Sequence, residues 1–211
     1  MKEGVKNKIF AKIRAQNKGW VFSAIDFLPD FRRWEIDRSL TDLEKDGQIR
    51  RILSGLYYYP DYSEILKEFV APSIRKVADA LARKYDWKIF PEGNTALYYL
   101  DLSTQVPAKY IYISNGSSRK YKIGNLDLEF RHRVPKESTI TNENANLVVQ
   151  AIKSMGKVHA SVPDFIKALS MRFSYDEWCE IEKAAKKVAY WILDIIMRAK
   201  TQTQNKINKE A

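Results

Sequence analysis

The sequence predicts an α+β protein with an N-terminal winged helix-turn-helix, a middle α+β unit that holds a small antiparallel sheet, and C-terminal helices. Two observations predict this class. Residues 33–60 read as an amphipathic helix followed at once by a short hairpin, and residues 141–200 carry apolar side chains three and four positions apart, as helices do. The 211 residues, 45% of them hydrophobic, suffice for one large or two small domains.

The first sixty residues give the order of elements found in a winged helix. A helical pattern over residues 1–16 precedes a short strand at 20–22, which we expect to pair with the wing. Ser23 is placed to cap a brief helix that ends at Phe27. We therefore predict a DNA-binding domain over residues 1–60.

The helix predicted at residues 33–45 has an apolar and a polar face. Ile36, Leu40 and Leu43 fall on one stripe, which predicts the buried side. The wing follows as two β-rich runs joined by a Gly-containing turn, namely residues 48–53, Ser54-Gly55 and residues 56–59.

The exposed face of this helix supplies the predicted DNA contacts. Arg38 and Thr41 are expected to contact base edges. Trp34 shares that face, but we interpret it as packing against the neighbouring helix, and Asp37 and Asp42 are expected to orient nearby arginines. Contacts with phosphate are assigned to the other cations of this region: Arg32, Arg33, Lys45, Arg50 and Arg51.

The middle of the chain predicts a polar connector at residues 61–70 and a second domain over residues 71–200. Helical patterns over residues 74–85 and 95–100 flank an extended segment. Three strands follow at 109–114, 120–123 and 126–132, and Asn115-Gly116 is a strong hairpin signal, so the pattern predicts an antiparallel meander.

The last third predicts helices over residues 141–155, 161–172 and 175–200, and a frayed polar tail at 201–211. The apolar stripe of the last helix either closes the core of its own domain or binds another protein, and we favour the core. Its members step by three and four: Trp178, Ile181, Ala185, Val188, Ile192 and Ile195.

Composition narrows the function classes. The formal net charge of +10 fits a polyanionic partner. The single cysteine, Cys179, excludes an internal disulfide and fits a reducing cytoplasm. Charged residues interrupt the N-terminus and no apolar run could span a bilayer, so we expect neither a secretory leader nor a membrane partner.

One pattern could indicate an enzyme. Gly116-Ser117 and the pair Asp127 and Glu129 mimic the signature of nucleotidyltransferases that hold two magnesium ions. That chemistry needs a helix after Gly-Ser, and the residues here are β-rich instead. We therefore expect no catalysis by these residues. The only histidines are His132 and His159, so we also expect no metal site and no cofactor.

Several motifs carry a family resemblance. The run GQIRRILSGLYYYP at residues 47–60, Pro91-Glu92-Gly93, and above all LSTQVP at residues 102–107 resemble the AbiEi family, the antitoxins of bacterial type IV toxin-antitoxin systems. The resemblance covers residues 1–135. Two positions depart from it, since Asp101 stands where a small residue such as Gly is expected and Ser54 occupies the wing tip, where a basic residue is usual.

The resemblance implies a winged-helix half that represses its own operon by binding double-stranded operator DNA. It also implies a C-terminal part that counteracts a nucleotidyltransferase-type toxin, either by touching the toxin or by opposing it at a shared target. Two alternatives stay open: a winged-helix regulator without a toxin partner, and a nucleotide-acting enzyme that uses Asp127 and Glu129.

Overall fold

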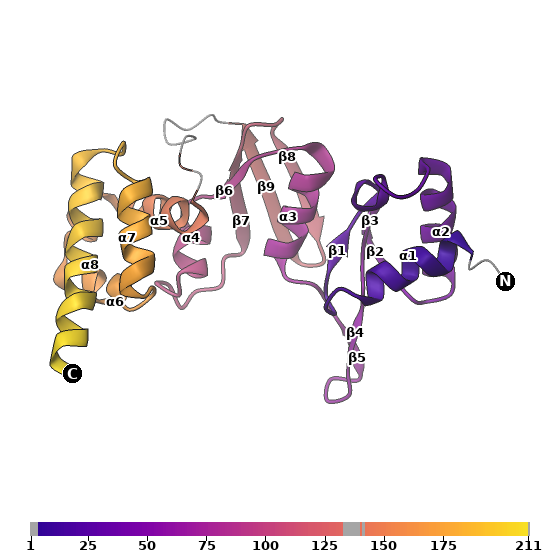
Figure 1. The fold of residues 1–211 in the computed structure, drawn as a ribbon, viewed down its shortest axis with the longest axis horizontal. Coiled ribbons are helices and arrows are strands. Elements are labelled where there is room, and N and C mark those ends of the chain that lie inside the picture. The colour runs from indigo at the N-terminus through magenta and orange to yellow at the C-terminus, as the bar shows by residue number, and fades with distance from the viewer. Residues whose placement is uncertain (1–3, 133–139, 141, 211) are drawn as a thin grey trace. The chain divides into compact units, whose positions relative to one another are not determined.

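The structure is a computed structural model that describes residues 4–132, 140 and 142–210 (Figure 1). It confirms the α+β class and divides the chain into two compact units, the first ending at Lys88 and the second beginning at Ile89. The first unit opens with α1 (Val5–Arg14), β1 (Val21–Phe22), η1 (Ala24–Phe27), α2 (Arg33–Lys45), β2 (Arg50–Leu53) and β3 (Leu56–Tyr58).

These elements appear in the predicted order and pair as expected. The three strands form an antiparallel sheet in the order β1-β3-β2, with Val21 opposite Tyr58 and Arg51 opposite Tyr57. The apolar stripe of α2 is at most 1% exposed and packs with α1, β1 and η1 in one core, whose members include Ile9, Ile13, Phe22, Phe27, Ile36, Leu40, Leu43, Ile49 and Tyr57.

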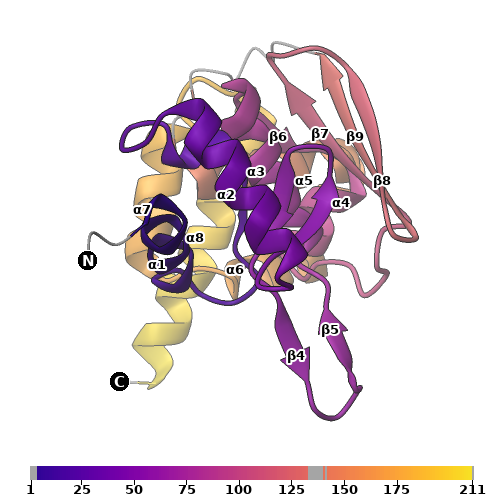
Figure 2. The ribbon, with the colours of Figure 1, turned by 90° about the vertical axis from the view of Figure 1, so that its right-hand side faces the viewer.

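The predicted connector at residues 61–70 is wrong. This segment is a hairpin of β4 (Asp61–Ser63) and β5 (Glu68–Val70), which Figures 1 and 2 show as a projecting two-stranded ribbon. The alternation of polar and apolar side chains over Asp61, Tyr62 and Ser63 is short, and a turn of four residues separates the strands, so the period-2 signal is weak.

The predicted boundary after residue 60 also differs from the structure. Helix α3 (Ile74–Tyr85) was expected to begin the second domain, but it belongs to the first unit and packs against β1 and η1. Its Arg83 donates hydrogen bonds to Asp26 Oδ1 at 2.8 Å and to the Val21 carbonyl at 2.9 Å. These contacts join residues about sixty positions apart, and local sequence patterns do not report them.

The second unit holds a four-stranded sheet in the order β6-β7-β9-β8, so the predicted antiparallel meander is wrong. Strand β7 pairs in parallel with β9, and β8 pairs antiparallel with β9 across the Gly124-Asn125 turn. The bounds of its strands are Ile89–Pro91 for β6, Lys109–Ser114 for β7, Arg119–Ile123 for β8 and Leu126–His132 for β9.

Burial explains this order of strands. The strand with three exposed cations, β8, lies at an edge, and β9 with buried Leu128 and Phe130 occupies the place beside β7. Asn115-Gly116 therefore begins a crossing over β9 instead of closing a hairpin.

The C-terminal helices pack around a core of their own (Figure 1). They are α5 (Glu143–Ala160), α6 (Pro163–Ser170), α7 (Tyr175–Ala184) and α8 (Tyr190–Glu210), and α4 (Asn94–Tyr99) from the middle of the chain joins the same core. The predicted single helix over 175–200 is wrong, because the chain breaks after Ala184 and α8 runs on through the predicted tail. The break lets Trp178 and Ile195, from α7 and α8, enter the same core, which confirms the core interpretation of the stripe.

No helix in the described parts of the chain is both long and apolar enough to traverse a lipid bilayer.

Candidate nucleic-acid interface

Helix α2 displays its polar face because its apolar stripe is buried. Arg32, Arg33 and Arg38 are exposed on it, as the sequence predicted. The guanidinium group of Arg38 is exposed and has no hydrogen-bond or ion-pair partner among the described residues, so none of its five donors is used within this part of the chain. This residue is therefore available to a ligand.

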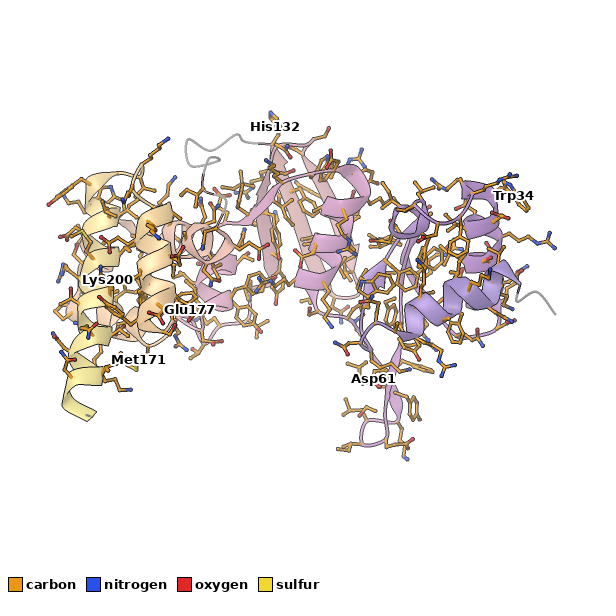
Figure 3. All side chains as sticks on the ribbon, in the orientation of Figure 1. Trp34, Asp61, His132, Met171, Glu177 and Lys200 are labelled. Atoms are coloured by element: carbon orange, nitrogen blue, oxygen red, sulfur yellow. The ribbon has the colours of Figure 1, made fainter. Side chains whose placement is uncertain are left out.

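Trp34 lies at the exposed start of α2, and the prediction that it packs against a neighbouring helix is wrong (Figure 3). Its side chain is 61% exposed, which is high for the largest apolar side chain. The physical reason is its place on the helix, since Trp34 stands one turn before Arg38 on the face opposite the buried stripe of α2.

Thr41 is half-buried, and its hydroxyl donates a hydrogen bond to the Asp37 carbonyl at 2.8 Å. A hydroxyl bonded back to its own helix keeps its lone pairs and its methyl group for a partner. The placement of Thr41 beside Arg38 on one face agrees with the spacing of the sequence, while its donor proton is used within α2.

Two of the predicted phosphate contacts are held in ion pairs. Arg33 Nε lies 2.8 Å from Asp37 Oδ2, one helical turn away, which confirms that Asp37 orients an arginine. Arg51 Nη2 lies 2.6 Å from Glu44 Oε2, so this pair fastens β2 to the end of α2. The hydrogen bond with Glu44 raises the pKa of Arg51, which stays charged.

The other predicted phosphate contacts differ in their surroundings. Arg50 is exposed, but its guanidinium lies 3.9 Å from the centre of the Phe69 ring on β5. Arg32 and Lys45 are exposed at the two ends of α2, and neither side chain has a described partner. The cationic groups free to move toward a polyanion are therefore Arg32, Arg38 and Lys45.

The tip of the β2–β3 hairpin carries a cation that the sequence did not indicate. Lys84 Nζ on α3 donates a hydrogen bond to the Ser54 carbonyl at 2.9 Å, and lies beside Gly55, whose φ is +65°. A positive charge thus lies at the tip of this hairpin, where Ser54 itself supplies none. Thirty positions separate Lys84 from Ser54, so no short-range pattern could have found it.

The residues of the nucleotidyltransferase-like pattern lie on strands of the second unit and in the turn before β8. Glu129 is 8% exposed and lies between Lys109 and Arg131, whose hydrogen bonds lower the pKa of its carboxyl group to about 2. Strand β8 begins soon after Gly116-Ser117, and no helix does. Among the described residues, no group of three or more histidine, cysteine or acidic side chains could hold a metal ion.

The LSTQVP segment at residues 102–107 links α4 to β7. Leu102 packs against the core of the C-terminal helices, and the Ser103 hydroxyl accepts a hydrogen bond from the Gln105 N–H at 3.2 Å. Asp101 has φ of +49°, and its carbonyl accepts a hydrogen bond from Arg172 Nη2 at 2.6 Å. A left-handed backbone is adopted at least cost by a residue without a Cβ, which agrees with the expectation of a small residue at this position.

Comparison with solved structures finds similarity to the crystal structure of the RV2827C protein from Mycobacterium tuberculosis. The TM-score is 0.44 and the sequence identity 12%, over 96% of this chain and 81% of that chain. The comparison with curated proteins gives no match. The model of a family of unknown function, DUF6088, matches residues 8–170, and the chain belongs to that family.

Proposed function

We propose that this protein binds double-stranded DNA through a winged helix-turn-helix in its first unit. The single observation that carries the proposal is Arg38, exposed in the middle of α2 with its guanidinium free, on the face opposite the buried stripe. An arginine so placed can donate two parallel hydrogen bonds to a guanine edge in the major groove.

The neighbouring residues would divide the work of binding. Arg32 and Lys45 would meet phosphates directly, because no acidic partner has to be displaced. Arg33 and Arg51 would contribute less, since each is already paired with a carboxylate. Trp34 would offer an apolar surface to sugars or to a thymine methyl group.

The biological role that we propose is that of an antitoxin of a bacterial type IV toxin-antitoxin system, acting in the cytoplasm. The first unit would repress the protein's own operon, and the second would counteract a nucleotidyltransferase-type toxin. The support for this role is the AbiEi resemblance of residues 1–135, with LSTQVP as its most distinctive motif. Direct contact with the toxin and opposition at its target are both compatible with it.

DNA binding is tested by footprinting the protein on the DNA upstream of its own gene. The wild type is expected to protect an inverted repeat, and Arg38→Ala to lose about tenfold or more in affinity for that repeat, since a good arginine-base pair contributes about 1–3 kcal/mol. Arg198→Ala, which removes an exposed arginine of α8, is the matched control. Equal binding by Arg38→Ala and wild type would refute the proposal that α2 contacts the bases through Arg38.

The antitoxin role is tested by co-expression with the adjacent gene. Rescue of growth by the full chain, and by a variant with Arg38→Ala, would place toxin control outside the DNA-binding face. A neighbour whose expression is harmless, or whose toxicity this protein leaves unchanged, would favour the alternative of a regulator without a toxin.

A further inference from the structure

The β4–β5 hairpin ends in an apolar tip. Ile65 is 93% exposed and Leu66 is 64% exposed, in the turn between the two strands. Tyr62 and Phe69, which are opposite each other on the strands, contact edge to face and are also exposed. Val70 is exposed too, and while single apolar residues on a surface are ordinary, five in ten consecutive positions form a patch.

This ribbon is short of stabilising neighbours. In the described parts of the chain, β4 and β5 pair only with each other. One contact that joins it to the rest of the first unit is the stacking of Arg50 on Phe69, at 3.9 Å. An isolated two-stranded hairpin is marginally stable in water, so further contacts at its tip would stabilise it.

The charge of the hairpin disfavours DNA as its partner. Residues 61–70 contain three acidic side chains, Asp61, Glu64 and Glu68, and one basic one, Lys67, within a chain of net charge +10. An acidic ribbon is repelled by phosphate and by anionic lipid. A second copy carries the same net charge of −2 over these ten residues, but Glu64 and Lys67 balance each other at its tip, so a contact confined to residues 64–67 brings no net charge together.

The sequence of the tip is complementary to itself. It reads Glu64-Ile65-Leu66-Lys67, with an acid at one end, a base at the other and two aliphatic residues between them. When two such turns meet about a two-fold axis between Ile65 and Leu66, Glu64 of each copy faces Lys67 of the other. A two-fold contact repeats each favourable pair twice.

We propose that the β4–β5 tip is a contact between two copies of this chain, built on this reciprocal pairing. Lys67 has φ of +54°, a backbone conformation that Gly adopts at less cost, and in the proposed contact its ammonium group has a defined use. The contact joins few residues, below the area of a stable interface, so the dimer is weak in solution. The inference does not depend on DNA binding.

The pair already present within one copy does not prevent this contact. Lys67 Nζ lies 3.1 Å from Glu64 Oε2, but the two side chains are 74% and 80% exposed, and surface pairs of this kind contribute little. Exchanging it for the pairs between copies costs little. For the same reason, reversing either charge is expected to leave the hairpin folded.

The test is sedimentation equilibrium of the full chain from about 10 µM to 1 mM, a range suited to a weak dimer. The wild type is expected to show a concentration-dependent rise in mass. Glu64→Lys and Lys67→Glu are each expected to weaken association by about tenfold or more, because like charges then face each other. Leu66→Asp should abolish it, and Glu180→Lys, an exposed residue of α7 in the same kind of pair, should not.

Mixing decides between the contact and a merely structural role of the tip. In an equimolar mixture of Glu64→Lys and Lys67→Glu, every facing pair across the axis is again opposite in charge, while the pair within each copy is broken. Recovery of the dimer in the mixture supports the proposal. A wild type that stays monomeric at 1 mM, or single variants that associate as the wild type does, or a mixture that stays monomeric, overturns it.

Discussion

Asp101 carries a strain that its neighbours hold in place. Its φ is +49°, and its carbonyl and carboxylate both face Arg172, with the carboxylate 3.5 Å from Nη1. A residue with a Cβ pays about 1 kcal/mol in this left-handed region, and an aspartate tolerates it better than most.

Substitution at this position should separate strain from side-chain contact. Asp101→Gly keeps the carbonyl acceptor and removes the strain, so its free energy of unfolding is expected to equal or exceed that of the wild type by up to about 1 kcal/mol. Asp101→Ala keeps the strain and is expected to lose about 1 kcal/mol. Urea denaturation measures both, and equal values for the two variants would contradict the argument.

Glu129 makes the stability of the second unit sensitive to acid. Its carboxyl pKa is lowered from 4.5 to about 2, first by the hydrogen bond from Lys109 and next by that from Arg131. A depressed pKa means that the folded state binds the proton less well than the unfolded state does. The stabilisation is therefore complete above pH 4.5 and is lost as the pH falls toward 2.

Glu129→Gln is expected to lower stability at pH 7 and to flatten the loss between pH 4.5 and 2. The contribution is at most about 3 kcal/mol, reduced by the partial exposure of both cations. Thermal unfolding across that pH range checks it, with Glu180→Gln on the exposed face of α7 as the control. An unchanged slope in Glu129→Gln would show that other carboxyl groups cause the acid loss.

At the scale of elements, the pair between Arg51 and Glu44 fastens the β2–β3 hairpin to α2. If α2 and this hairpin contact DNA, Glu44 both restrains Arg51 and repels phosphate. Glu44→Gln is then expected to raise DNA affinity for all sequences alike. The slope of log affinity against log salt concentration should steepen by up to about one unit, because one more phosphate contact releases about one more counterion.

The measurement is a series of binding titrations on specific and unrelated DNA at several salt concentrations. Arg51→Ala supplies the opposite change and should weaken binding. A weaker binding by Glu44→Gln would indicate that the fastened geometry matters more than the charge. Glu180→Gln is the matched control, because it removes an acidic side chain that is far from α2 in the sequence.

Elements differ in how well the sequence predicted them. The limits of β9 and the stripe of α2 follow from periodicity within one element. The crossing from β7 to β8 does not, because Asn115-Gly116 reports a local turn preference, whereas the order of strands depends on which strand buries more apolar surface. The break between α7 and α8 likewise depends on burial, because it lets Trp178 and Ile195 enter one core.

At the scale of the whole molecule, the boundary between units falls at Lys88 and Ile89. Helix α3 completes the first unit through Arg83, which bonds to Asp26 and to the Val21 carbonyl. A fragment of residues 1–88 is therefore expected to unfold cooperatively. A fragment of residues 1–60 lacks α3 and these hydrogen bonds, so we expect its free energy of unfolding to be lower.

Circular dichroism during heating distinguishes the two fragments, and a footprint on the same DNA tests their binding. We expect the fragment of residues 1–88 to show the thermal unfolding transition that this unit has in the full chain, and to bind the DNA with the affinity of the full chain. A fragment of residues 1–60 that melts at the same temperature as residues 1–88 would show that α3 adds no stability to the first unit.

The sequence by itself determined the features that depend on neighbours within a turn or a strand: the buried and exposed faces of α2, the place of Arg38 on the exposed one, and the pairing of Asp37 with a nearby arginine. The tertiary structure alone decided which distant groups meet, as Lys84 does with Ser54 and Arg50 with Phe69. Periodicity records which side of an element is apolar. It does not record which other element covers that side, because many pairings bury the same area, and the one adopted depends on the packing of the whole unit.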